Sequence, residues 1–422
     1  MRIGLVILCV VCLASSLAYV IGRGERMRAE AGGRCCFTSE GYVLWNGVRS
    51  IAGGADPYSG EVSLQNEIYL YGSSASLRGL EPQRFAYPMY TVLPLLPIGW
   101  LGFHAASRVL LVVFGALLAC WIGWLRGKWD RGTWIYTIVA FATYPVLYDF
   151  VSLQPTVLAL ALATGGLALL RSRQFAWAAA VTALSMIKPQ IAAPILLPIL
   201  VAAIDLKEYR RFAVWLVAAG AGLALLAGML RPRWVAEWIS AARDYARYSP
   251  HSMASGWFGP AAPAISGLIV LGLIVLLWAL RHSDLLFRIS LSVVLLYPLL
   301  PYRSYNAAVF AIPVIWLADN TALVKACGAM HELALGIARM AVIALWAFTG
   351  IGAALLWSSA WKIGFMLPIA GLHLVLVSLF AVMLMQCGSE LRNRHGRAAV
   401  AGVASPGSSY SDLPKSTATL SE

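Results

Sequence analysis

The chain has 422 residues, of which 60% are hydrophobic and only 12% are charged, and its mean hydropathy is +0.74. A soluble domain is about a quarter charged because its surface must stay hydrated, so this composition excludes a water-soluble globular protein. The net charge of +13 does not indicate nucleic-acid binding, because the basic residues lie in short loops beside apolar stretches, as the positive-inside rule requires. We therefore expect membrane lipids around the protein and no nucleic acid as a partner.

Apolar stretches follow one another along the chain and predict helices, since backbone groups in lipid must hydrogen bond within their own segment. The predicted fold class is an all-α, polytopic membrane bundle of about 12 transmembrane helices. It forms a single domain over residues 1–387, followed by a polar, serine-rich tail over 388–422 that we expect to be disordered in the cytoplasm. The predicted spans are residues 3–22, 106–125, 133–151, 155–171, 175–205 (two short helices broken at Lys188-Pro189), 212–230, 263–281, 286–301, 306–319, 335–357 and 363–386.

Two polar segments, residues 23–105 and 231–262, are predicted as extracytoplasmic loops. The first is long and should contain interfacial helices. The stretch from Glu40 to Ile51 has an amphipathic pattern, and the prolines in residues 86–104 argue against a plain spanning helix there.

The basic residues favour one side of the predicted membrane, which the positive-inside rule assigns to the cytoplasm. Both termini then lie in the cytoplasm, and the chain is a multi-pass protein of the cell (inner) membrane whose active site faces the periplasm or the outside. The inner loops hold Arg126, Lys128, Arg131, Arg171, Arg173, Lys207, Arg210, Arg211, Arg281, Arg288, Lys325, Arg392, Arg394 and Arg397.

Two carboxylates of the first outer loop, Glu40 and Asp56, have aromatic neighbours in the sequence such as Tyr58. An apolar setting raises the pKa of a carboxyl group and suits it to act as a base near neutrality. The alternative is a solvated loop acid without a catalytic role.

Two cations lie at the outer ends of apolar runs. Lys188 has no flanking loop, and its ammonium beside a helix N-terminus suits a phosphate at the membrane surface. Arg303 lies between Tyr302 and Asn306 in the sequence, and its guanidinium can bind a phosphate through two parallel hydrogen bonds. The alternatives are a snorkelling lysine that marks a turn and an arginine within an interfacial aromatic belt.

Other polar and aromatic residues gather on the same predicted face. Asp149 and Gln154 lie at the boundary of two spans, where polar groups are unusual, although ordinary helix capping also accounts for them. Trp257 in the second loop is suited to stack on a sugar ring and equally to anchor the chain at the interface.

Five segments, taken in order, resemble glycosyltransferase family 87, and the resemblance covers roughly residues 1 to 320 of the chain. Each segment is weakly specific alone, and the common order carries the resemblance. They are VRSIAGGADPY (48–58), FAYPMYTVLPLLPIGWLGFHAASRVL (85–110), YPVLYDFVSLQP (144–155), ALSMIKPQIAAPILLPIL (183–200) and PLLPYRSYN (298–306).

The resemblance implies an integral-membrane, mannosyltransferase-like enzyme with a GT-C architecture. Such enzymes take a hexose from a polyprenyl-phosphate carrier at the outer membrane face and pass it, with inversion, to a lipid or glycan acceptor. Their catalytic base is an acidic residue of the first outer loop, usually aspartate, and the matching position here is Glu40. Their Gly-Gln pair appears as Leu153-Gln154, and their later acidic position as Asn306.

The remaining roles follow from the same resemblance. Lys188 and Arg303 would stabilise the charge on the departing phosphate. We expect no cofactor, and the sequence contains no metal-ligand spacing that would indicate a divalent cation. The groups that would orient sugar hydroxyls are Tyr58, Tyr87, Gln154 and Gln190.

Two other functions stay open at the level of sequence. A transporter or flippase of lipid-linked sugars would also be polytopic and basic, but such proteins often contain internal repeats, and this chain shows none. A non-catalytic membrane homologue is the second alternative, because glutamate at position 40 replaces the usual aspartate.

Overall fold

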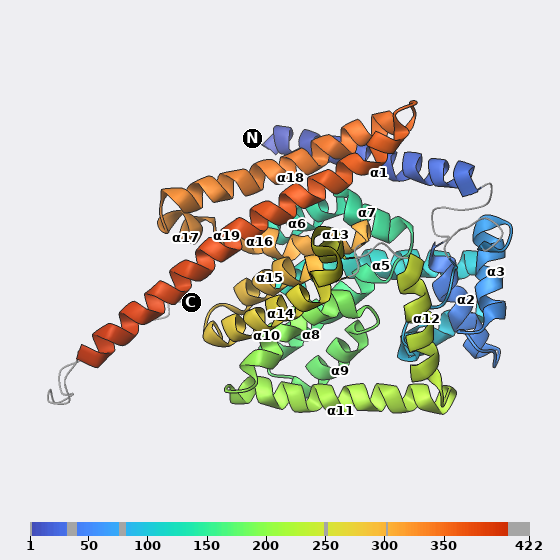
Figure 1. The fold of residues 1–422 in the computed structure, drawn as a ribbon, viewed down its shortest axis with the longest axis horizontal. Coiled ribbons are helices and arrows are strands. Elements are labelled where there is room, and N and C mark those ends of the chain that lie inside the picture. Colours follow the sequence, from blue (N-terminus) through green and yellow to red (C-terminus); the bar gives the residue numbers. More distant parts are fainter. Residues whose placement is uncertain (1, 32–39, 76–81, 249–251, 301–302, 404–422) are drawn as a thin grey trace.

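A computed structural model of the protein describes residues 2–31, 40–75, 82–248, 252–300 and 303–403, and within these ranges it contains helices and no strand (Figure 1). The predicted all-α class is thereby confirmed. The helices are α1 (Arg2–Ala31), α2 (Glu40–Ala52), α3 (Gly60–Tyr71), η2 (Met89–Thr91), α4 (Val92–Leu95), η3 (Leu96–Trp100), α5 (Phe103–Arg126), α6 (Arg131–Phe141), α7 (Tyr144–Val151), α8 (Thr156–Arg171), α9 (Phe175–Ser185), α10 (Pro189–Ala202), α11 (Lys207–Leu230), α12 (Trp234–Tyr248), α13 (Met253–Phe258), η4 (Gly259–Ala261), α14 (Ala262–Ala279), α15 (Leu285–Leu296), η5 (Tyr297–Leu299), η6 (Ser304–Phe310), α16 (Ala311–Asp319), α17 (Thr321–Ala326), α18 (Ala329–Leu356) and α19 (Trp361–Val403).

Five helical segments of the described chain are long and apolar enough to cross a membrane, and the bent pair α6–α7 makes six if it counts as one span. The chain is therefore a membrane protein, while the larger number of crossings stays a prediction. The five segments are Phe103–Arg126, Lys207–Leu230, Met253–Ala279, Ala329–Leu356 and Trp361–Arg392, and the shorter apolar helices are Met89–Trp100, Thr156–Arg171, Phe175–Ser185, Pro189–Ala202, Leu285–Leu299 and Asn306–Asp319.

Two interruptions agree with the sequence pattern. Residues 89–100 form the short pieces η2, α4 and η3 instead of one helix, because proline removes a backbone donor and clashes with the preceding turn. The run 175–205 is split into α9 and α10 at Lys188, which precedes Pro189 in the first turn of α10. Proline favours that position because its missing N–H would be unsatisfied there anyway.

One expectation needs correction. The predicted span 133–151 is not one straight helix, because α6 and α7 meet at an angle of 74°. The break falls at Thr143, whose backbone is extended, and Pro145 stands in the first turn of α7, where it lacks the N–H that would continue the hydrogen bonding of α6. Beyond residue 388, α19 continues to Val403. Residues 404–422 lie outside the described chain, and the disordered tail stays a prediction.

Helices α2, α3 and α12, from the two predicted outer loops, lie at one end of the bundle, which we call the loop end (Figure 1). The C-terminal part of α19 lies at the opposite end. Helices α1, α18 and α19 pack along one side and α11 lies along the other. Between them, α15 is buried on all sides from Phe287 to Val294, whereas α11 buries only Phe212 and Ala227, as expected for a helix that contacts lipid.

An ion cluster ties α5 to α16 away from the loop end. Arg126 donates through Nε and Nη2 to the two carboxylate oxygens of Asp319, both at 2.9 Å, and through Nη1 to Asp130 at 2.6 Å. The guanidinium of Arg126, together with the backbone N–H of Thr133, holds the pKa of Asp130 at about 2. Bidentate arginine–carboxylate pairs fix geometry as well as charge, so this cluster sets the register of the two helices.

Close packing of α8 on α9 gives a test of the fold. A methyl group added at Gly166 would overlap Thr182 Oγ1 and lie 3.2 Å from the carbonyl oxygen of Ala178. Overpacking of this kind costs about 1–3 kcal/mol, so we expect Gly166→Ala to lower the thermal unfolding temperature of the detergent-purified protein.

The neighbouring glycine is the matched control. A methyl group at Gly165 meets only the ring of Trp124 at 3.5 Å, and alanine is the better helix former. Gly165→Ala should leave the unfolding temperature unchanged or raise it. Equal losses in both variants would contradict the packing of α8 on α9 described here.

Candidate functional site

The short connection between α7 and α8 collects most of the buried polar residues predicted from the sequence. Asp149, fully buried in the last turn of α7, accepts a hydrogen bond of 2.9 Å from the backbone N–H of Val157. The first N–H groups of a helix lack intrahelical acceptors and carry partial positive charge. The carboxylate therefore satisfies and stabilises the N-terminus of α8. We call the cluster of Asp149, Gln154, Thr156, Lys188 and Asn306 the α7–α8 junction.

The turn inside this junction has an unusual backbone. Leu153 has φ = 56°, a left-handed conformation that glycine normally supplies at the end of a helix. The backbone N–H of Gln154 reaches back to the carbonyl of Asp149 at 2.9 Å, which is the closing bond of such a turn. Strained residues of this kind persist where the surrounding structure over-determines them.

Gly41 provides the space for the Leu153 side chain. A Cβ atom built on Gly41 would lie 2.6 Å from Leu153 Cβ and 3.1 Å from its Cδ1, so only glycine fits at position 41 with leucine at 153. This contact joins the first turn of α2 to the α7–α8 junction. It brings the backbone of Glu40, the first residue of α2, to the same place.

Lys188 enters the junction from the break between α9 and α10. Its Nζ donates to Thr156 Oγ1 at 2.5 Å, and Thr156 in turn donates to Asn306 Oδ1 at 3.5 Å. All three residues are buried, and Lys188 is only 4% exposed. A buried ammonium requires polar partners, and this row supplies them from three helices, α8, α10 and η6.

A second row of hydrogen bonds links the first loop to the junction. Tyr58 donates from its hydroxyl to the carbonyl of Tyr87 at 2.8 Å, and Tyr87 donates to Gln154 Oε1 at 3.5 Å. Burial raises the pKa of the Tyr58 hydroxyl well above its usual range, so this hydroxyl stays protonated and remains a donor. The polar side chains of the two rows thus lie around residues 153–156.

Asp56 forms its hydrogen bond and its ion pair with residues other than those of the α7–α8 junction. Its Oδ1 accepts from the backbone N–H of Tyr58 at 2.9 Å, and its Oδ2 pairs with Arg231 at the end of α11. Arg231 also binds Glu237 at 3.0 Å, and the two carboxylates, Glu237 first, raise the pKa of its guanidinium. This pair joins the first and second predicted loops, so its contacts are with the protein itself.

The remaining predicted site residues are less enclosed or lie outside the described chain. Gln190 is half-buried in the first turn of α10, and Arg303 is half-buried immediately before η6, where its carbonyl accepts from the Asn306 N–H at 2.9 Å. Trp257 is 54% exposed in α13. The side chain of Glu40 and all of Tyr302 lie outside the described residues.

Two residues that sequence reasoning missed belong to the geometry. Thr156 connects Lys188 to Asn306, and Arg231 connects Asp56 to Glu237. The only signal for Thr156 was its position directly after Gln154-Pro155. In the described ranges, no group of three or more His, Cys, Asp or Glu side chains is arranged to hold a metal ion.

Comparison with known proteins gives one match. The family model for glycosyltransferase family 87 matches residues 85–301, which include Asp149, Gln154, Thr156 and Lys188 of the junction. No curated protein and no solved structure matches the chain.

The contact between Gly41 and Leu153 can be tested with a double-mutant cycle. Gly41→Ala alone should lower the unfolding temperature and the activity, because the new methyl group would collide with Leu153. In a Leu153→Gly background the obstructing side chain is absent, and the same change should cost little. Thermal unfolding of the four proteins measures the coupling. Additive losses would show that the two positions are not in contact.

Proposed function

Since the chain belongs to glycosyltransferase family 87 and is a membrane glycosyltransferase, we propose that it transfers a hexose, specifically mannose, from a polyprenyl-phosphate donor. The acceptor is a lipid or glycan hydroxyl at the extracytoplasmic face. The observation that carries this proposal is the convergence of α2, the segment before η2, α8, the start of α10 and η6 on the α7–α8 junction. That convergence supports a single reaction centre built from distant parts of the chain.

Glu40 acts as the general base in this proposal. Its backbone starts α2 immediately beside Gly41, which packs on Leu153 of the junction. The carboxylate takes the proton of the acceptor hydroxyl as the acceptor oxygen forms a bond to the anomeric carbon. The bond between that carbon and the phosphate oxygen breaks, and its electron pair stays on the departing polyprenyl phosphate. Attack opposite the leaving group inverts the anomeric configuration.

The departing phosphate needs positive charge, and two cations flank the junction. Lys188 is held by Thr156 at the N-terminus of α10, and Arg303 lies one turn before Asn306. Preorganised cations in a water-poor site stabilise developing negative charge without reorganising. Helix N-termini at the same place add favourable dipoles.

Neutral polar groups orient the sugar. Tyr87 and Gln154 present a hydroxyl and an amide at the junction, and Tyr58 fixes the loop that carries Tyr87. Hydroxyl and amide groups of this kind bind sugar hydroxyls as both donors and acceptors. Gln190, two residues beyond Lys188, completes this set.

The test is transfer from polyprenyl-phosphate-mannose to a hydroxylated lipid or glycan by the purified protein. Glu40→Gln removes the base and should lower turnover by about 10²–10⁴-fold, with an unchanged unfolding temperature. Glu61→Gln, in the exposed first turn of α3, is the matched control and should retain activity.

Equal turnover in wild type and Glu40→Gln would remove Glu40 from the mechanism. Absence of transfer by the wild type, together with movement of the intact donor across a vesicle membrane, would favour the flippase alternative. Product with retained anomeric configuration would contradict a single-base displacement.

Sidedness is tested by cysteine labelling in intact cells, in a background that lacks the native cysteines. We expect a cysteine at Ser39, in the first predicted outer loop, to react with an impermeant reagent. A cysteine at Ser172, exposed where α8 ends, should stay unlabelled until the membrane is permeabilised. Labelling of Ser172→Cys in intact cells would overturn the assigned orientation.

A further inference from the structure

The guanidinium of Arg23 is enclosed by aromatic side chains of three helices. Its central carbon lies 4.1 Å from the ring centre of Phe365 in α19 and 5.1 Å from that of Tyr148 in α7. The ionisable groups that face it are Tyr19, Tyr144 and Tyr148, phenols that carry no charge near neutrality. These rings attract a cation through their faces but do not neutralise it.

Two nitrogen atoms of this guanidinium are without an acceptor. Within the described chain, Nε and Nη1 of Arg23 are buried and have no hydrogen-bond partner, and no carboxylate forms an ion pair with the group. The Tyr19 hydroxyl is hydrogen-bonded to the Arg23 side chain and donates its own proton to the carbonyl of Phe365 at 3.1 Å. A buried, unneutralised charge is strongly unfavourable. An anion that accepts two parallel hydrogen bonds is the natural complement of such a fork.

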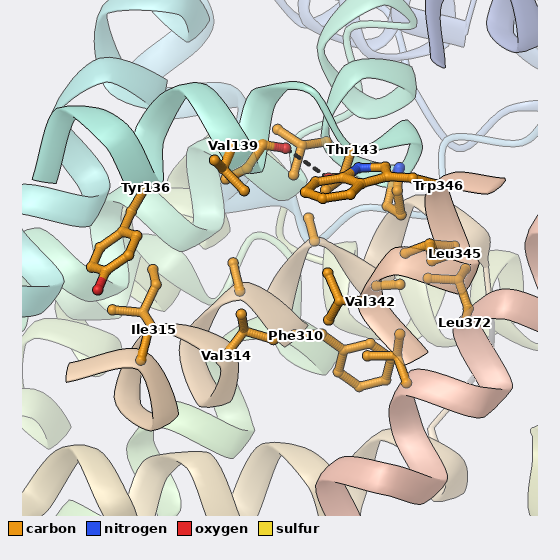
Figure 2. Close-up of a pocket in the computed structure, with 18 residues that line it drawn as sticks. Tyr136, Val139, Thr143, Phe310, Val314, Ile315, Val342, Leu345, Trp346 and Leu372 are labelled. Carbon is orange, nitrogen blue, oxygen red and sulfur yellow. Dashed lines mark hydrogen bonds between the residues drawn. The ribbon is translucent and has the colours of Figure 1, made fainter. Parts of the chain in front are cut away.

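An apolar cavity of about 90 Å³ is lined by residues of α6, α7, η6, α16, α18 and α19 (Figure 2). Two of these helices, α7 and α19, also cover Arg23. They contribute Pro145 and Val146 of α7 and Leu372 and Val375 of α19 to the wall. On α7, Pro145 lies about one turn from the Tyr148 that covers Arg23. The cavity therefore continues the Arg23 surroundings away from the loop end, where hydrocarbon chains would be accommodated.

One polar atom of this cavity lacks an acceptor. The lining is apolar apart from Tyr136, Thr143 and Trp346. Tyr136 donates to Asp319 at 3.4 Å and Thr143 to the carbonyl of Ala140 at 2.6 Å. The indole N–H of Trp346, by contrast, is buried with no partner in the described residues. A ligand that fills the cavity thus meets one donor among apolar walls.

The two donors, the guanidinium of Arg23 and the indole N–H of Trp346, lie at different heights along the bundle. Gly22 of α1 packs against Leu356 of α18, and Gly350 of α18 packs against Ser15 of α1, so the two helices run parallel. With about 1.5 Å per helical residue, Trp346 then lies about 16 Å from Arg23 along the bundle. An anionic headgroup at Arg23 and a carbonyl oxygen nearer Trp346 match this order.

We propose that Arg23, the apolar cavity and Trp346 form a binding site for an ester-linked phospholipid. The phosphate accepts hydrogen bonds from Arg23, an ester carbonyl accepts one from Trp346, and an acyl chain occupies the cavity. The site is separate from the proposed donor site. Tyr148 faces Arg23, whereas the next residue, Asp149, caps α8 on the side of Lys188.

The test uses the delipidated protein in neutral detergent, with lipid binding followed by thermal unfolding. The ligands are ester-linked phosphatidylglycerol, its ether-linked analogue, polyprenyl phosphate and inorganic phosphate. The ester lipid should stabilise the wild type most. Arg23→Gln should weaken its binding by about ten-fold or more, as expected for losing hydrogen bonds to a charged group. Without lipid, Arg23→Gln should be at least as stable as the wild type, because it removes a buried charge.

Two further variants separate the contributions. Arg28→Gln changes an exposed arginine of the same helix and should bind lipid like the wild type. Trp346→Phe keeps the ring but removes the N–H, and should weaken binding of the ester lipid while leaving the ether analogue unaffected. If Arg23→Gln does not fold, this variant still tests the site.

Three results would overturn the proposal. One is equal stabilisation of wild type and Arg23→Gln by the ester lipid. Another is full stabilisation by inorganic phosphate alone. The third is stronger stabilisation by polyprenyl phosphate than by phosphatidylglycerol, which would assign the site to an isoprenoid phosphate instead. Because transfer activity is not measured, none of these results bears on the role of Glu40.

Discussion

The hydrogen bond between the Asp149 carboxylate and the Val157 backbone fixes the start of α8, and the other parts of the site are positioned from that point. Thr156, one residue earlier, holds Lys188. The turn that precedes it meets Gly41 of α2. A buried helix N-terminus must find acceptors for its free N–H groups. Here the acceptor is a carboxylate in the turn that also carries the strained backbone, so capping and site assembly depend on one short segment.

The sequence predicted what local chemistry determines and missed what depends on distant partners. The helical class follows from hydropathy alone, and the break at Lys188 follows from the proline after it. The 74° bend between α6 and α7 has a local signal in Pro145, but hydropathy alone conceals it, because the apolar pattern is continuous across the bend. The role of Asp56 in substrate binding stays a prediction. Its pairing with Arg231, 175 residues away, could not be predicted, because it depends on tertiary packing that no local pattern reveals.

Charged side chains of this protein lie where helices end or meet, and three of the cations have different kinds of partner. Arg126 is matched by the two carboxylates of Asp319 and Asp130, a geometry that suits a fixed joint. Lys188 is held by neutral oxygen in the junction. Arg23 has aromatic faces and no carboxylate among the described residues. The first arrangement is self-sufficient, whereas the Arg23 guanidinium is the group that we propose binds a lipid phosphate.

The Leu153 side chain occupies the space that a side chain at position 41 would need, and this restricts which residues the two positions can hold. With leucine in the left-handed turn, any side chain at position 41 larger than hydrogen meets an atom closer than 3 Å. With glycine in the turn instead, a side chain at position 41 would not meet the Leu153 side chain. The two positions are therefore coupled, and a change at either one alters which residues the other can hold.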